Sequence, residues 1–213
     1  MSRSHLTCIA LLVTTVAVAT ALAEPPALPI RYEGIVYTTN APGGATRSMR
    51  VKITVERWTT REEAAALREQ LESGGQDALL KAMETIEAGY MQVDTSLRWR
   101  VRIATTFETE KGRVVRIATD RPISFAETRN SARSMDYPIG VVEFTLPPDG
   151  AAGTGGILAA TKVGFDDGGK LVIESLPQNT GANPFLNIKA KPAPAEKKKK
   201  EKATEPETAT EKD

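Results

Sequence analysis

The sequence predicts an α+β protein rich in β-structure: an antiparallel sheet, a sandwich or an open barrel with an inserted hairpin of two helices. Three observations support this fold class. Several segments alternate apolar and polar residues with the period of two that is typical of strands. Their connections are short, whereas parallel strands would need crossovers of about a dozen residues or more. A single segment, residues 60–89, instead has helical periodicity.

The first two strands are expected to form a hairpin. Residues 32–39 are rich in β-forming side chains and end at the turn sequence Asn-Ala-Pro-Gly-Gly of residues 40–44. From Met49 to Val55 every second residue is apolar, and Arg50, Lys52 and Thr54 lie between them. This alternation predicts a strand with one buried face and one polar face.

Two helices are expected next. Residues 60–63, Thr-Arg-Glu-Glu, match a capping box, in which the Thr hydroxyl and the Glu carboxylate bind free amides at a helix start. Apolar residues including Leu67 follow at helical spacing, and Gly74-Gly75 would end this first helix. Asp77 is a suitable cap for a second helix that ends at Gly89. The pair would cover an apolar face of the sheet.

Strands resume after the helical segment. Turn residues between them lie at Lys111-Gly112, at residues 147–150 and at residues 166–169. The glycine-rich residues 153–156 lack the Gly-Lys-Ser/Thr of a phosphate-binding loop and precede a strand, so we interpret them as a turn. The predicted strands are 97–103, 113–119, 139–146, 156–165, 171–176 and 185–188.

Residues 1–23 are predicted to be a secretory signal peptide. Arg3 precedes an apolar run over residues 6–21, and Ala21-Leu22-Ala23 is a typical cleavage site. We therefore expect export to the periplasm or the extracellular space, with a mature chain that begins at Glu24. A retained N-terminal anchor is the alternative.

The C-terminal residues 191–213 are predicted to be disordered. Lys, Glu, Pro and Ala dominate this tail, and it has no bulky apolar residue to offset the entropy of ordering. One β-rich globular domain over residues 24–190 remains. The lysines at 197–200 would allow peripheral contact with an anionic membrane, although a purely solubilising tail is the simpler interpretation.

Composition excludes several kinds of chemistry. The chain has one cysteine, Cys8, and one histidine, His5, and both lie in the predicted signal peptide. The mature protein would therefore lack Ser-His-Asp and Cys-His catalysis and ordinary zinc or blue-copper sites. We expect no cofactor and no metal, because the acidic pair at 166–167 also lacks calcium-loop spacing. The net charge of +1 argues against nucleic-acid binding.

The best candidate for a binding site is the long connection over residues 120–138. Such long loops are often functional, and arginines beside aromatic residues bind carboxylates, phosphates or sugar rings. A packed loop whose charges pair locally is the alternative interpretation. The candidate ligand-binding residues are Asp120, Arg121, Arg129, Arg133, Asp136 and Tyr137.

A row of three arginines offers a second candidate. On a regular strand Arg98, Arg100 and Arg102 would project from one face at a spacing of roughly 6.6–6.8 Å. This would make an anion-binding face for lipid phosphate, an acidic glycan or a protein partner. The alternative is an ordinary solvated face whose arginines pair with glutamates on the neighbouring strand.

Three fragments carry a family resemblance: Trp58-Thr59-Thr60, residues 118–123 (Ala-Thr-Asp-Arg-Pro-Ile) and residues 134–138 (Ser-Met-Asp-Tyr-Pro). Together they resemble exported bacterial proteins of unknown function. The resemblance implies a stand-alone exported domain and transfers no activity and no functional residue.

The function expected from the sequence is an exported, non-catalytic domain that binds a component of the cell envelope or a partner protein. One alternative is a structural accessory subunit that docks on another envelope protein. A carboxylate-dependent hydrolase is the other, because carboxylates are the main acid–base groups left in the mature chain.

Overall fold

A computed structural model describes residues 26–38, 46–96, 98–123, 137–166, 168, 170–176 and 181–193. The predicted signal peptide and residues 194–213 of the predicted tail lie outside these ranges. The elements are β1 (Ile30–Thr38), β2 (Arg47–Val55), α1 (Arg61–Met83), β3 (Gly89–Val93), β4 (Trp99–Thr109), β5 (Gly112–Thr119), β6 (Ile139–Leu146), β7 (Gly153–Phe165), β8 (Leu171–Ser175) and β9 (Asn183–Pro192). The prediction of a β-rich antiparallel fold is confirmed.

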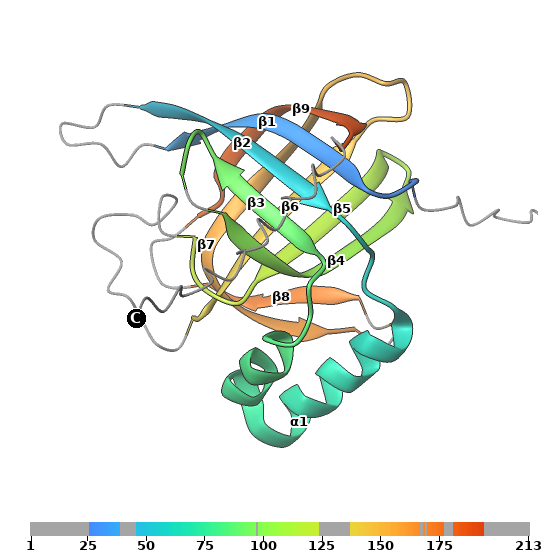
Figure 1. Ribbon diagram of the computed structural model, residues 1–213, viewed down its shortest axis with the longest axis vertical. Coiled ribbons are helices and arrows are strands. Elements are labelled where there is room, and N and C mark those ends of the chain that lie inside the picture. The colour runs from blue at the N-terminus through green and yellow to red at the C-terminus, as the bar shows by residue number, and fades with distance from the viewer. Residues whose placement is uncertain are drawn as a thin grey trace, which may run out of the picture.

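The sheet closes into a barrel of eight strands (Figure 1). Neighbouring strands follow the order β6-β5-β4-β3-β2-β1-β9-β7, and an additional pairing between β6 and β7 completes the ring. All of these pairings are antiparallel. The ninth strand, β8, pairs with β7 outside the ring. Closure satisfies the backbone groups that a sandwich or an open barrel would leave at its edges.

The helical segment is a single element, which corrects the predicted hairpin of two helices. The capping box is present: Thr60 Oγ1 accepts from the amide of Glu63, and a Glu63 carboxylate oxygen accepts from the amide of Thr60. Gly75 has φ 68° and breaks the helical geometry within α1. Because glycine adopts this conformation freely, the helix changes direction at one residue and needs no loop. The side-chain amide of Gln76 then donates to the carbonyl of Val163 at 2.8 Å, which fixes the kink on β7.

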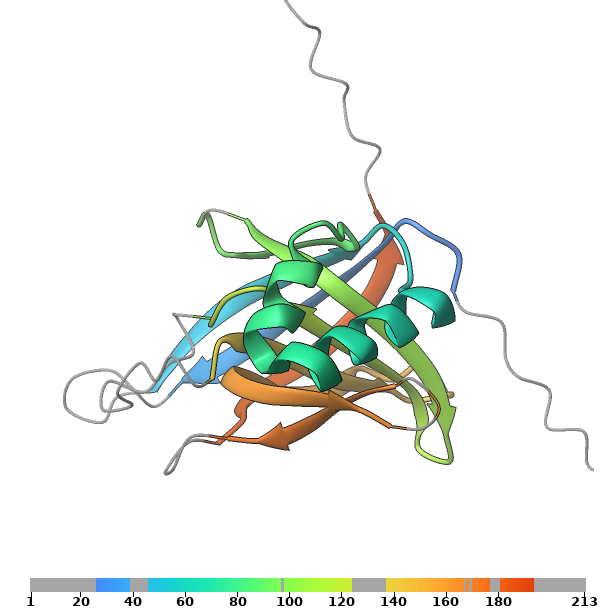
Figure 2. The same cartoon turned by 90° about the horizontal axis from the view of Figure 1, so that it is seen from below.

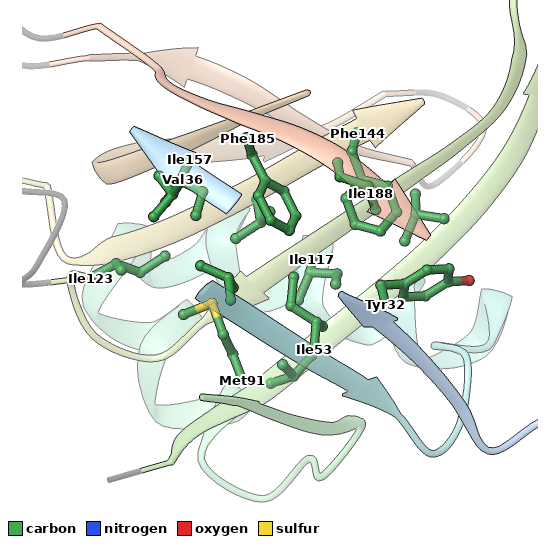
Figure 3. Packing of buried hydrophobic residues seen from close by; sticks show 14 of the residues in the cluster. Tyr32, Val36, Ile53, Met91, Ile117, Ile123, Phe144, Ile157, Phe185 and Ile188 are labelled. Atoms are coloured by element: carbon green, nitrogen blue, oxygen red, sulfur yellow. The ribbon is translucent and has the colours of Figure 1, made fainter. Parts of the chain in front are cut away.

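The interior of the barrel is packed with apolar side chains (Figure 3). The ring of Phe144 lies between those of Tyr32 and Phe185, with centroid distances of 4.9 Å and 5.9 Å. Gly155 allows β7 to pass close to β6, since a Cβ atom there would lie 2.1 Å from the carbonyl oxygen of Glu143. The labelled residues of Figure 3 are Tyr32, Val36, Ile53, Met91, Ile117, Ile123, Phe144, Ile157, Phe185 and Ile188.

A second core lies between the barrel and α1. Figure 2 shows the helix in front of the barrel, with β7 and β8 beside it. The apolar side chains of this layer are Leu67, Leu79, Met83 and Ile86 from the helical segment and Ile103, Ala118, Ile139, Val141, Leu158, Val163 and Leu171 from β4 to β8. The helix and β8 therefore cover the outer side of β4, β5, β6 and β7. Figure 1 places β1 and β9 on the opposite side of the barrel.

Among the described residues, no helix combines the length and the apolar character that are needed to cross a membrane.

Candidate functional site

The predicted arginine row is interrupted at Arg102. The pairing of β4 with β5 shifts register between Val101 and Ile103, so a β-bulge removes Arg102 from the regular alternation. Its side chain lies under the end of α1, and the residue is only 5% exposed. Arg100 stays exposed and pairs with Glu87 at 3.0 Å. The three arginines therefore do not form one open anion-binding face.

Arg102 instead joins three parts of the fold. Its Nε donates to Asp120 Oδ2 at 2.7 Å, at the start of the 120–138 connection. Its Nη1 donates to the carbonyl oxygens of Glu84 and Ile86 at 2.9 Å and 2.7 Å. These carbonyls follow the last turn of α1, where helical hydrogen bonding ends and a cation is favourable. Arg102 and Asp120 are thus positioning residues of the scaffold.

The other predicted loop residues contact different strands. The Arg121 guanidinium lies 5.9 Å from the Trp99 ring centroid, and its Nη2 donates to the carbonyl oxygen of Arg98. Tyr137 lies against β7, where the Nζ of Lys162 is 5.5 Å from its ring centroid. The remaining members, Arg129, Arg133 and Asp136, lie outside the described residues.

The side of the barrel opposite α1 carries a concentration of positive charge. We call this surface the basic wall: the outward side chains of β9, β1, β2 and β3. Regular alternation turns its apolar residues into the barrel and its polar residues outward, as the burial patterns show. Five cations and one carboxylate share this face in the described strands: Arg31, Arg50, Lys52, Lys189, Lys191 and Glu33.

Strand register brings these charges together. Glu33 on β1 is opposite Lys52 on β2 and opposite Lys189 on β9. Neighbouring strands lie about 4.8 Å apart, so each cation is within one or two strand spacings of the next. On the same wall Arg31 is opposite Lys191. Residues about 150 positions apart in the sequence therefore form one surface.

Two adjoining grooves cross the basic wall. The first, of about 280 Å³, is lined by Glu33, Lys189, Lys191 and Asn187 together with Ile35 and Arg50. The second, of about 470 Å³, is lined by Lys52, Ser48 and Asp94 and again by Ile35 and Arg50. Because Ile35 and Arg50 line both, the two grooves meet at these residues.

A β-bulge shapes the first groove. The pairing of β1 with β9 shifts register between Glu33 and Ile35, and Asn187 on β9 has φ 56°. Asparagine adopts this left-handed conformation more readily than most residues. The bulge lets Ile188 enter the barrel core while Asn187 lines the groove.

The electrostatics of the wall are unbalanced. Lys191 Nζ donates to Glu33 Oε2 at 2.8 Å, and this hydrogen bond is the main reason why the pKa of Glu33 is held below its usual value of 4.5. Glu33 therefore stays ionised and neutralises one lysine. Arg50, Lys52 and Lys189 form no ion pair with any carboxylate among the described residues.

Two buried polar atoms on a facing pair of residues in β1 and β2 have no hydrogen-bond partner among the described residues. They are Arg31 Nε and Thr54 Oγ1, on residues that pair across β1 and β2. A buried donor or acceptor without a partner costs about 1–3 kcal/mol. The side chain of Arg31 is therefore not held by a hydrogen bond at Nε, in contrast to the tightly bound Arg102.

Another groove, of about 540 Å³, lies between α1 and the β7–β8 hairpin. Its lining includes Leu71 and Phe165 and charges of both signs. Arg68 pairs with Glu72 at 2.7 Å within this groove. Because its charges are mixed and partly paired, this groove favours anionic ligands less than the basic wall does.

Comparisons with protein-family models, curated proteins and solved structures find no significant match. The function is therefore inferred from the residues of the chain itself. Within the described ranges, no group of three or more His, Cys, Asp or Glu residues is placed to hold a metal ion.

The predicted strands include β1, β2 and the middle of β9 but not β3, and the wall itself was not predicted. The alternation of Arg50 and Lys52 with apolar residues predicted one polar face. Lys189 lies beyond the predicted end of the last strand, and Lys191 lies in the predicted tail, whereas β9 continues to Pro192. The alternation of Lys189 and Lys191 around Ala190 was the available signal for this extension.

Proposed function

We propose that this protein is an exported, non-catalytic domain that holds an anionic component of the cell envelope on its basic wall. The observation that carries the proposal is the pair of grooves that meet at Arg50, on strands whose outward side chains include five cations and one carboxylate, with Asp94 as a second carboxylate at the edge of one groove. Export rests on the predicted signal peptide, and the predicted Lys-rich tail would add a peripheral contact.

The chemistry of the wall suits phosphate or carboxylate groups. A guanidinium such as that of Arg50 offers paired N–H donors to two oxygens of one anion, whereas lysines contribute mobile point charges. Each cation near an anionic surface contributes about 1 kcal/mol, and the contribution falls off within a Debye length of about 8 Å at physiological salt. Binding should therefore be strong at low salt and weak at high salt.

The test compares two triple variants of the mature chain that have the same change in net charge. The wall variant replaces Arg50, Lys52 and Lys189 with Glu. The control variant replaces Arg61, Lys81 and Lys111, which are exposed residues of α1 and the β4–β5 turn, with Glu. Binding to phosphatidylglycerol vesicles and to poly-L-glutamate is measured at low salt by sedimentation and by titration, with circular dichroism as a check on folding.

We expect the wall variant to lose about 3 kcal/mol of binding, which is more than a hundredfold in affinity, on at least one of the two probes. The control variant should bind nearly as well as the wild type. Absence of wild-type binding to both probes, or an equal loss in the two variants, would contradict the proposal.

A single substitution offers a gain-of-affinity test. Glu33→Gln removes the one carboxylate of the wall and releases Lys191 from its ion pair. Affinity for anionic probes should rise, and Glu87→Gln, which releases the exposed Arg100 beyond the wall, is the matched control. An unchanged or lower affinity of the Glu33 variant would show that the wall does not face the ligand.

A further inference from the structure

We infer that the ligand of the basic wall is an extended anionic polymer, a linear chain of carboxylate or phosphate groups that lies in the joined grooves across β9, β1 and β2. This inference rests on the proposed function and specifies the class of ligand. A flat anionic membrane is the competing ligand.

The shape of the surface favours a chain over a plane. In a closed barrel the outer face curves away across the strands, so a flat bilayer would meet the cations of only one or two strands at a time. The grooves instead run across the strands and share Ile35 and Arg50. A flexible chain that follows this depression crosses β1 and contacts the lysines of β9 as well as Arg50 and Lys52 of β2.

The positions of the cations define a path. Lys189 and Lys191 alternate along β9, which places them roughly 6.6 Å apart at one end of the path. Arg50 lies at the junction of the two grooves, and Lys52 lines the second groove. A polymer with repeated charges would meet a new cation as it advances, whereas a single anion would meet one or two.

Other side chains limit and orient the chain. Asn187 lines the first groove and presents a neutral amide where the bulge of β9 opens it. Ile35 provides an apolar contact at the junction for the polymer backbone. Asp94 lines the far end of the second groove, and its Oδ1 accepts from the amide of Arg50 at 2.9 Å. Its negative charge would stop an anionic chain there.

The test measures binding of the mature chain to glutamate, poly-L-glutamate, orthophosphate, long-chain polyphosphate and phosphatidylglycerol vesicles. Linked charges engage neighbouring cations at high effective concentration, so we expect a polymer to bind at least about tenfold more tightly per anionic group than its monomer. Arg50→Gln should weaken polymer binding more than Lys111→Gln, a neutralisation outside the wall.

Asn187 supplies a second measurement that does not depend on removing charge. Asn187→Gly keeps a residue that tolerates the left-handed backbone but removes the amide, and Asn187→Asp places a negative charge in the groove. We expect a several-fold loss of polymer affinity for the first variant and a larger loss for the second. The barrel should stay folded in both, as monitored by circular dichroism.

The outcomes separate the two proposals. Vesicle binding that depends on the wall, without any advantage of either polymer over its monomer, would overturn the polymer inference and leave the proposed function standing. Polymer affinity that is unaffected by Arg50→Gln and Asn187→Asp would also overturn the inference. Failure of every probe to bind the wild-type chain would overturn the proposed function as well.

Discussion

Replacement of Arg102 with Met is expected to destabilise the protein strongly, although the residue is far from the basic wall. The substitution keeps most of the buried volume but removes three hydrogen bonds. The carboxylate of Asp120 would lose its cationic partner, and the carbonyls of Glu84 and Ile86 would lose their donor. The end of α1, the bulge of β4 and the start of the 120–138 connection would no longer be joined.

The size of the effect follows from burial. Removal of one partner from a buried ion pair typically costs about 3–5 kcal/mol. The side chain of Asp120 is 19% exposed, so water partly compensates for the lost partner and the lower end, about 3 kcal/mol, is expected. Arg100→Met is the matched control, because its ion pair with Glu87 is exposed on both sides and worth about 0–1 kcal/mol.

Urea unfolding of both variants tests this reasoning. With a denaturant dependence of about 1–3 kcal/mol per molar, Arg102→Met should lower the unfolding midpoint by about 1–3 M. The double variant Arg102→Met with Asp120→Leu should recover part of the loss, since no unpaired charge remains. If the midpoints of the Arg102 and Arg100 variants coincide, the buried ion pair does not hold α1 to the barrel.

Four further outcomes are expected. Gly155→Ala should lower the melting temperature by several degrees, because its Cβ would meet the β6 backbone, whereas Gly164→Ala should be tolerated, since its nearest contact would be an ordinary 3.4 Å. Thr60→Ala should cost about 1 kcal/mol of unfolding free energy through loss of the helix cap, measured in urea. The folded-state pKa of Glu33 is depressed, so its ion pair stabilises the fold above pH 4.5, and this stabilisation is lost as the pH falls through the folded-state pKa. Glu33→Gln should therefore make the free energy of unfolding less dependent on pH in that acidic range. Exported protein should begin at Glu24, and intact Met1 in its N-terminal mass would contradict cleavage of the predicted signal peptide.

Local patterns predicted most of the strands, although not β3. Alternation along β2 and along the start of β4 arises because each strand has one face in the barrel core, so burial is visible at every second residue. The capping box at Thr60 was equally local and is confirmed. These features depend on residues close together in the chain, which is why the sequence alone indicates them.

Departures from regular geometry were not predictable in the same way. The bulge at Arg102 reverses which residues face inward, so that Val101 and Ala104 both reach the barrel core while Ile103 packs under α1. Strict alternation therefore predicted a solvent-facing Arg102. The kink at Gly75 similarly replaced the end of one helix and the start of another, because a glycine doublet is compatible with both arrangements.

The candidate site depended on long-range pairing. Arg50 meets Ile35 within the β1–β2 hairpin, but Lys189 meets Glu33 only because the last strand of the chain lies beside the first. Nothing in the local pattern of β9 specifies that neighbour. The predicted candidate sites instead each lay within one segment, the 120–138 connection or a single strand. Patterns within one segment are visible in a sequence, whereas the pairing of distant strands is not.

The pairing of β1 with β9 also has a kinetic consequence. Ile30 meets Pro192, so the ring is joined by contacts between the two most distant parts of the described chain. Contacts of such large sequence separation carry a high loop-closure cost and are associated with slow folding. During synthesis β1 could pair early with β2, whereas its other neighbour, β9, would be made only when nearly the whole chain was complete. The nascent protein would thus remain incompletely folded until late, and the basic wall would be assembled in the last step.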